Sequence, residues 1–246
     1  MVPALGFCQR RGPVLGGGSQ GQGRSGSRLV QCPPMLWVSE IFHSIQGESS
    51  RAGWPCVFVR LTGCNLRCVW CDTAYAFHEG RSMSVGEVVA EVERYRCPLV
   101  ELTGGEPLLQ PEAIPLMEEL LRRGRRVLLE TGGGLSIADV PRGVVRIVDV
   151  KCPGSGESDR NHWANLEILE GKDEIKFVVA DRRDYSWASQ QVRERDLTRR
   201  CSVLFSPVHG VLHPGDLARW VLDDGLPVRV QIQLHKILWP GAERGV

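Results

Sequence analysis

Three cysteines within eight residues are the most chemically specific feature of the sequence. Cys64, Cys68 and Cys71 lie in the segment Leu61-Thr-Gly-Cys-Asn-Leu-Arg-Cys-Val-Trp-Cys-Asp-Thr73. Three soft ligands so close together favour one metal centre. A cubane iron–sulfur cluster has four iron atoms, so three thiolates leave one iron open to a ligand that is not protein. Two alternatives compete: a zinc site with Cys56 or His78 as fourth ligand, and a chance group of buried thiols.

Composition supports metal chemistry in a reducing compartment. The chain has 246 residues, 42% hydrophobic and 24% charged, which is ordinary for one soluble globular domain. No apolar run of membrane-spanning length and no secretory leader is apparent, so we expect a cytoplasmic protein. Nine cysteines are an odd count, which favours a metal site over a disulfide framework. The net charge of +1 and the absence of a basic stripe give no reason to expect nucleic-acid binding.

The first 34 residues differ from the rest of the chain. They hold eight glycines, four prolines, four arginines and no acidic residue. Such a composition cannot bury a core. We therefore expect residues 1–34 to be a disordered extension and residues 35–246 to be the folded domain.

The hydrophobic pattern after Met35 alternates between strands and helices. Predicted strands cover 36–42, 57–61, 99–103, 126–130, 144–150, 174–180, 202–205 and 228–234. Predicted helices cover 85–96, 111–121, 183–195 and 214–223. Ser84 and Glu87 form a capping box at the first of these helices. This order predicts an α/β fold, an incomplete TIM-type barrel of parallel strands with outer helices.

Polar residues follow the predicted strand ends. They are the cysteine loop, Thr103-Gly-Gly-Glu106, Glu130-Thr131, Asp149-Val150-Lys151, Ser206-Pro207 and His235. In barrel folds the carboxyl ends of the strands build the active site, so these residues are predicted to share one site. Taken singly, each has a plainer interpretation: the glycine pair as a tight turn, and Lys151 or Ser206 as solvated loop residues.

Several motifs together resemble a known family. The spacing C-x3-C-x2-C resembles the radical S-adenosylmethionine (SAM) superfamily, in which the open iron binds the amino and carboxylate groups of SAM. Thr103-Gly-Gly-Glu-Pro107 resembles that superfamily's element for the SAM amino group. With Ser44-Ile-Gln-Gly-Glu48, the run from Gly53 to Arg60, and Gln233-Leu-His235, the chain from Met35 onward resembles the 7-carboxy-7-deazaguanine synthase family.

The resemblance implies a reaction and its partners. The reaction is a ring contraction of 6-carboxy-5,6,7,8-tetrahydropterin to 7-carboxy-7-deazaguanine with loss of ammonia, a step of queuosine-type 7-deazapurine biosynthesis. It implies a 4Fe–4S cluster, SAM, Mg²⁺, a flavodoxin- or ferredoxin-like electron donor and a homodimer. One rival is an activating enzyme for a glycyl-radical protein, which should lack the Gln46 and Arg60 elements. Another is a non-catalytic zinc or iron–sulfur module, which has no need of Thr103-Gly-Gly-Glu106.

The resemblance also implies a role for individual residues. The cluster ligands would be Cys64, Cys68 and Cys71. The SAM site would comprise Trp70, Cys71, Asp72, Gly105, Asp149, Val150, Lys151, Ser206, Pro207, Val208 and His209. The substrate site would comprise Ile45, Gln46, Gly47, Glu48, Arg60, Thr103 and His235. Thr73 matches the family's magnesium-binding threonine, although a threonine there could equally cap a helix. The usual chain end of the family binds substrate in some members, and here six residues follow Pro240.

Overall fold

The structure is a computed structural model that describes residues 35–246, arranged around one nine-stranded sheet. The extension predicted for residues 1–34 lies outside the described residues. The sheet order is β3-β1-β2-β4-β5-β6-β7-β8-β9. The strands are β1 (Met35–Ile45), β2 (Pro55–Leu61), β3 (Arg81–Ser84), β4 (Leu99–Gly104), β5 (Arg126–Thr131), β6 (Val145–Asp149), β7 (Glu174–Val179), β8 (Ser202–Pro207) and β9 (Arg229–Val230).

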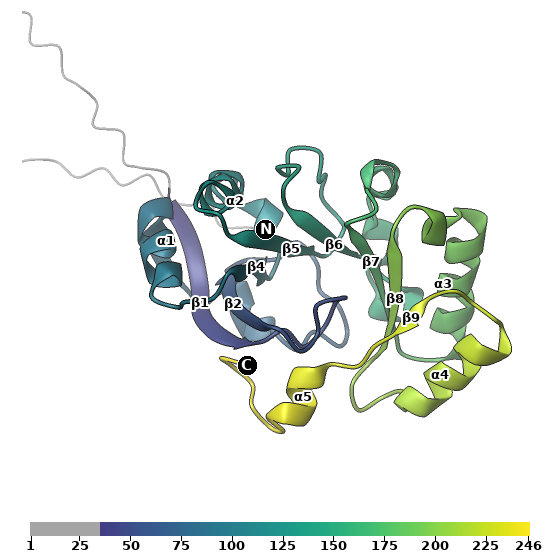
Figure 1. Ribbon diagram of the computed structural model, residues 1–246. Coiled ribbons are helices and arrows are strands. Elements are labelled where there is room, and N and C mark those ends of the chain that lie inside the picture. The colour runs from purple at the N-terminus through teal and green to yellow at the C-terminus, as the bar shows by residue number, and fades with distance from the viewer. Residues whose placement is uncertain (1–34) are drawn as a thin grey trace, which may run out of the picture. The chain divides into compact units, whose positions relative to one another are not determined.

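The seven strands from β2 through β9, β3 excepted, are parallel, whereas β1 pairs antiparallel with β2 and β3. The sheet curves without closing, which is the predicted incomplete barrel, with an antiparallel edge that the parallel prediction missed (Figure 1). Its concave side is therefore open along one flank.

Four helices cover the convex side of the sheet (Figure 1). They are α1 (Val85–Glu93), α2 (Ala113–Arg122), α3 (Arg182–Glu194) and α4 (Pro214–Asp223). Each buries one apolar face, as Val88, Val89 and Val92 do on α1. The predicted capping box is present, because Ser84 accepts from the Glu87 backbone while the Glu87 side chain accepts from the Ser84 backbone. Short 3₁₀ turns replace a helix between β6 and β7.

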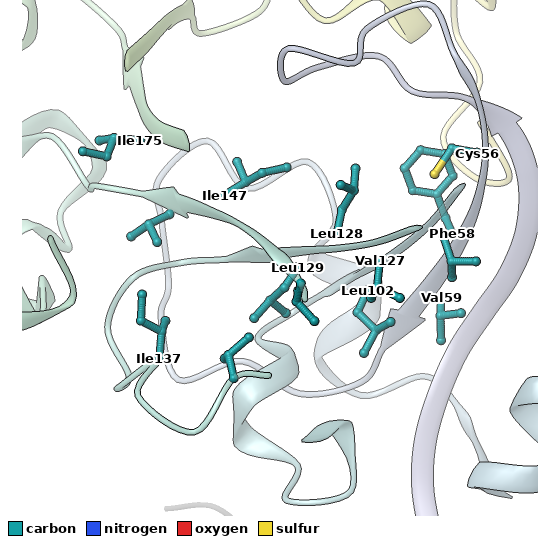
Figure 2. Packing of buried hydrophobic residues seen from close by; sticks show 14 of the residues in the cluster. Cys56, Phe58, Val59, Leu102, Val127, Leu128, Leu129, Ile137, Ile147 and Ile175 are labelled. Carbon is teal, nitrogen blue, oxygen red and sulfur yellow. The ribbon is translucent and has the colours of Figure 1, made fainter. Parts of the chain in front are cut away.

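Alternation along the strands separates a packed core from a polar interior. Leu128 and Leu129 point to opposite sides of β5, and Leu102 and Val59 pack on the same side as Leu129 (Figure 2). That outer layer meets the helices. On the inner side, β4 carries Glu101 between apolar neighbours, a polar residue at a position directed into the barrel. The concave side is thus built for chemistry, whereas the convex side supplies the packing.

The chain after β8 departs from the prediction. A strand over 228–234 was expected, yet β9 spans only Arg229–Val230, and Leu234–Leu238 forms the short helix α5. The Leu234 amide donates to the Gly47 carbonyl at 2.9 Å instead of extending the sheet. The β1–β2 loop also bridges the open flank, because Arg51 forms an ion pair of 3.0 Å with Glu174 of β7. The loop and α5 lie side by side at this flank (Figure 1).

Candidate active site

One cavity of about 540 Å³ occupies the concave side, at the carboxyl ends of the parallel strands. Every residue that the sequence assigned to the cluster, SAM, magnesium or the substrate lines it, except Val150. They are Ile45, Gln46, Gly47, Glu48, Arg60, Cys64, Cys68, Trp70, Cys71, Asp72, Thr73, Thr103, Gly105, Asp149, Lys151, Ser206, Pro207, Val208, His209 and His235. The Val150 side chain is instead in the core, 3% exposed, and its amide donates to the Lys176 carbonyl.

The three clustered cysteines face this cavity from the loop after β2. The Leu66 amide donates to Cys64 Sγ at 3.4 Å, which is the kind of bond that supports a cluster thiolate. Burial raises the pKa of Cys64 and that of Cys68, so a bound cation is needed to hold them as thiolates. Among residues 35–246 no three His, Cys, Asp or Glu side chains converge on one metal ion. In a cubane each thiolate binds its own iron, and three cysteines that line one cavity from one loop offer that set of ligands.

The candidate fourth ligands of a zinc site lie apart from this group. Cys56 is fully buried within β2, and its thiol donates to the Val57 carbonyl. Neither Cys56 nor His78 lines the cavity that the three cysteines share. Neither candidate fourth ligand therefore shares the cavity with the three thiols, which argues against the zinc alternative as stated.

Gly105 lets the end of β4 approach the cysteine loop. A Cβ atom at this position would lie 1.9 Å from the Gly63 carbonyl oxygen and 3.1 Å from Cys64 Cβ. The next amide, of Glu106, donates to that carbonyl at 2.7 Å. A side chain would fill the space between the cysteine loop and β4, so the glycine is required for close backbone approach.

Glu106 fixes this loop to the neighbouring strand. Its carboxyl group, 1% exposed, accepts hydrogen bonds from Thr131 Oγ1 at 2.8 Å, from the Gly132 amide at 2.8 Å and from the Leu108 amide at 3.0 Å. These bonds join the ends of β4 and β5. The glutamate of the Thr-Gly-Gly-Glu motif thus shapes the wall of the cavity through its own hydrogen bonds.

Arg60 presents the free end of its guanidinium to the cavity. Its Nε donates to Glu40 Oε1 at 2.8 Å, and the side chain is only 12% exposed. Tyr75 and Phe42 flank the guanidinium, with ring centroids 6.0 and 5.7 Å from Cζ. The guanidinium makes no other hydrogen bond within the described residues, which leaves both terminal nitrogens to hold an anion in a planar fork.

The β1–β2 loop and α5 form the opposite wall. A Cβ on Gly47 would lie 2.1 Å from His235 Nδ1, so the helix packs directly on the loop backbone. Gln233 Nε2 donates to Glu48 Oε1 at 3.0 Å, and Lys236 pairs with Asp72 at 3.3 Å. Burial lowers the pKa of His235. His235 was predicted to follow a strand, and the helix brings it to the same cavity.

A buried charge network forms the floor, and the sequence reasoning gave its central residue no role. Lys176 of β7 forms ion pairs with Glu130, with Glu48 at 2.9 Å and with Asp149 at 3.8 Å. Although burial opposes it, the Lys176 ammonium lowers the pKa of Glu130 to about 2. Lys176 and Glu101 are charged residues within apolar strands, and the period-2 alternation could have identified both as interior residues.

Three further predicted residues, Lys151, Asp149 and Thr73, also line the cavity. Lys151 Nζ pairs with Asp149 Oδ2 at 2.8 Å, while Asp149 Oδ1 is buried without a hydrogen-bond partner in the described protein. An orphaned buried carboxylate oxygen beside a cavity is suited to a ligand donor group. Thr73 precedes a 3₁₀ turn but makes no capping hydrogen bond, and its hydroxyl lies 3.8 Å from Cys71 Sγ. The capping alternative therefore has no hydrogen bond to support it.

The chain's last residues reach the same cavity. Arg244 lies 4.1 Å above the Tyr75 ring and pairs with Glu79 at 2.7 Å, and Val246 lines the cavity.

In the region that the structure covers, no helix is long and apolar enough to cross a bilayer.

Comparisons with known proteins agree with this geometry. The model of the radical SAM superfamily matches residues 58–147. A 7-carboxy-7-deazaguanine synthase of Koribacter versatilis is 49% identical over 226 residues, covering 86% of this chain and 100% of the relative. One of Chlorobaculum tepidum is 47% identical, covering 86% of this chain and 97% of the relative.

A solved structure confirms the fold. The crystal structure of QueE from Escherichia coli superposes with a TM-score of 0.65 at 22% identity, covering 82% of this chain and 95% of that one. At that identity the likeness supports the incomplete barrel alone. The sequence relatives, which the chain matches over nearly their full length, show that it belongs to the 7-carboxy-7-deazaguanine synthase family of the radical SAM superfamily.

Proposed function

We propose that this protein converts 6-carboxy-5,6,7,8-tetrahydropterin to 7-carboxy-7-deazaguanine with loss of ammonia. The observation that carries the proposal is the joint placement of the cysteine loop, Gly105, Gln46 and Arg60 on one cavity. An activating enzyme for a protein radical has no use for a buried pocket with an anion-binding fork and an amide. A binding module has no use for the close packing of Gly105 on the cysteine loop.

The cluster and SAM are assigned to the half of the cavity beside the cysteine loop. Cys64, Cys68 and Cys71 would hold a 4Fe–4S cluster, and the open iron would take the amino and carboxylate groups of SAM. When bound, the cluster and SAM together would supply the chemistry that abstracts a hydrogen atom from the substrate. The remaining SAM contacts are assigned to Trp70, Asp72, Gly105, the 149–151 segment and the 206–209 segment. The free Oδ1 of Asp149 is placed to accept from a ligand amino or hydroxyl group.

The substrate is assigned to the half beside the β1–β2 loop. The terminal nitrogens of Arg60 would bind the carboxylate of the substrate as a bidentate pair. Gln46, Thr103, Glu48 and His235 would surround the pterin ring, with the backbone at 45–47 completing its hydrogen bonds. The loop and α5 cover the open flank of the barrel, which keeps bulk water from a reactive intermediate.

Magnesium is assigned to Thr73. A neutral hydroxyl is a weak ligand for a hard cation that prefers several oxygens, so Thr73 needs oxygens from the substrate carboxylate to complete the shell. Support comes from Thr73 itself, which lines the cavity and whose hydroxyl does not cap the turn that follows. Mg²⁺ and substrate should then tighten each other's binding by the same factor.

The proposal extends to two partners. A flavodoxin- or ferredoxin-like protein would reduce the cluster, and two copies of the chain would associate as a homodimer. Both assignments rest on the resemblance to the family that the sequence motifs indicate. Sedimentation of the purified protein and reduction with a chosen donor test them separately.

The test of function is an anaerobic assay with a defined product. Protein reconstituted with iron and sulfide is mixed with SAM, a reductant and 6-carboxy-5,6,7,8-tetrahydropterin, and the product is identified by mass spectrometry. We expect 7-carboxy-7-deazaguanine and ammonia in equal amounts. Consumption of SAM with an intact pterin would contradict the proposal.

A cysteine series provides the matched control. Alanine at Cys64, Cys68 or Cys71 should abolish the visible absorption of the cluster and all turnover. Cys201→Ala should retain both, because Cys201 is buried away from the cavity lining. Stoichiometric zinc in place of iron after anaerobic preparation would favour the zinc alternative instead.

A further inference from the structure

The carboxyl group of Glu101 lies on the cavity floor and has no role among those assigned above. Glu101 is 2% exposed on β4, faces the cavity, and lies two residues before Thr103 on the same side of the strand. No lysine, arginine or histidine of the described chain lies within ion-pair distance of it. A buried carboxyl without a cation is costly as an anion, so a neutral acid is the stable form.

Burial and the two neighbouring carboxylates favour the neutral form of Glu101. Burial is the main cause that raises the pKa of Glu101 well above its ordinary value, and the negative charges of Glu130 on β5 and Glu48 on the β1–β2 loop act in the same direction. Lys176 on β7 and Arg60 on β2 oppose them. Both cations are already committed, Lys176 to Glu48 and Glu130, and Arg60 to a carboxylate of β1.

The hydrogen bonds fix which oxygen of Glu101 carries the proton. The Glu48 backbone amide donates to Gln46 Oε1 at 2.9 Å, so the amide of Gln46 cannot be flipped. Gln46 Nε2 must then donate to Glu101 Oε2, which makes that oxygen an acceptor. The proton of the neutral acid therefore belongs on Oε1, the oxygen for which the described protein offers no partner, beside the cavity that Glu101 lines.

We propose that Glu101 is a specificity-determining residue, a neutral carboxylic acid that donates a hydrogen bond from Oε1 to the 4-oxo group of the substrate heterocycle. The inference rests on the proposed function for the class of substrate. To that function it adds one contact. The 4-oxo oxygen is the hydrogen-bond acceptor on the 2-amino-4-oxopyrimidine edge of the substrate, and Glu101 would donate to it. The neighbouring Glu130, ionised by Lys176, suits the N–H groups of the same edge.

The fixed position of the Glu101 proton lets the site distinguish a 4-oxo heterocycle from a 4-amino heterocycle. A 4-amino heterocycle presents N–H donors where the 4-oxo group presents an acceptor, so two donors would meet at Glu101. Moving the proton to Oε2 would only transfer the conflict to Gln46, whose Nε2 must donate there. Sites built around a buried hydrogen bond reject analogues that leave it unmade.

The test compares Glu101→Leu with Glu101→Gln in protein loaded with cluster and SAM. In Glu101→Gln the new carbonyl can accept from Gln46 while the new amide donates to the cavity, so this variant reproduces the neutral acid. We expect Glu101→Leu to weaken binding of 6-carboxytetrahydropterin about 10-fold to 100-fold, and Glu101→Gln to restore affinity to within about threefold. Anaerobic calorimetry measures both constants.

The pH profile and a substrate analogue give readouts that a merely structural role would not move. Wild-type affinity should fall as pH rises through the raised pKa of Glu101, whereas Glu101→Gln should lose this dependence. The wild type should prefer the 4-oxo substrate to its 2,4-diamino analogue at least about 10-fold, and Glu101→Leu should lose most of that preference.

Two outcomes would overturn the assignment. In the first, Glu101→Gln binds as weakly as Glu101→Leu, which would mean that the site requires an anion. In the second, both variants bind like the wild type and keep its preference. If Glu101→Leu fails to fold, the pH profiles of the wild type and Glu101→Gln still decide. Product formation by the wild type is measured separately, so failure here is distinct from failure of the proposed function.

Discussion

Gly105→Ala is predicted to separate the cysteine loop from the end of β4. The added Cβ would lie 1.9 Å from the Gly63 carbonyl oxygen, so one backbone must move by about 1.5 Å to reach ordinary contact. Neither segment is a flexible side chain. The shift would break the 2.7 Å hydrogen bond from the Glu106 amide to that carbonyl and displace Cys64.

The expected cost combines two effects. Overpacking of a tight contact costs about 1–3 kcal/mol, and loss of a backbone hydrogen bond adds about 1 kcal/mol. For a domain of this size, that sum lowers the melting temperature by roughly 4–16 °C. Because Cys64 moves with the loop, iron content and SAM affinity should fall as well.

Differential scanning calorimetry, iron analysis and SAM titration measure these effects, with Gly86→Ala as the matched control. Gly86 lies in α1 with nothing within 4 Å of the added Cβ, so alanine there should stabilise the protein by about 0.5–1 kcal/mol. A Gly105→Ala protein with wild-type melting temperature and full iron content would refute the reasoning.

Three further predictions concern the cavity. Lys176→Met should cost about 3–5 kcal/mol at neutral pH, since it leaves carboxylates without their cation. In the wild type the depressed pKa of Glu130 contributes stability above about pH 4.5, and this stability is lost as pH falls towards 2. In Lys176→Met burial raises the pKa of Glu130, so the loss of unfolding free energy relative to the wild type shrinks on acidification. Equal deficits at pH 7 and pH 5 in urea unfolding would contradict this. Arg60→Lys should weaken substrate binding about 10-fold by calorimetry, because a lysine cannot reproduce the planar fork; unchanged affinity in both Arg60→Lys and Arg60→Ala would exclude the role. Thr73→Ala should keep the melting temperature within about 2 °C but lose the magnesium effect on substrate affinity, which Thr73→Ser should retain; the reverse pattern would restore the capping interpretation.

The interpretations that succeeded from the sequence rest on local causes. The spacing of Cys64, Cys68 and Cys71 is a property of one loop, and the capping box at Ser84 involves residues three apart. Each buried strand could be identified from its own apolar run. Because parallel strands place their carboxyl ends on one edge, the strand-end residues were expected to meet, and members of every group line one cavity, with Val150 and Glu106 as exceptions.

The segment 228–234 shows a case in which tertiary contacts override the local sequence pattern. The run Val228-Arg-Val-Gln-Ile-Gln-Leu234 alternates like a strand, yet only Arg229–Val230 pairs with β8. The open flank of the barrel offers Leu234 a partner in the Gly47 carbonyl, and a helix there brings His235 to the cavity. Pattern alone cannot detect a flank that exists only after the sheet has curved.

The side-chain pairings on the cavity floor depend on the tertiary fold. Gln46 meets Glu101 across 55 positions of sequence, and Lys176 meets Glu48 across 128. Such pairings depend on strand order and register, which no single segment encodes. The sequence by itself therefore determined the cofactor chemistry, because cluster ligands are spaced locally, whereas the protonation and hydrogen-bond direction of the substrate half depend on burial and neighbours that only the tertiary structure supplies.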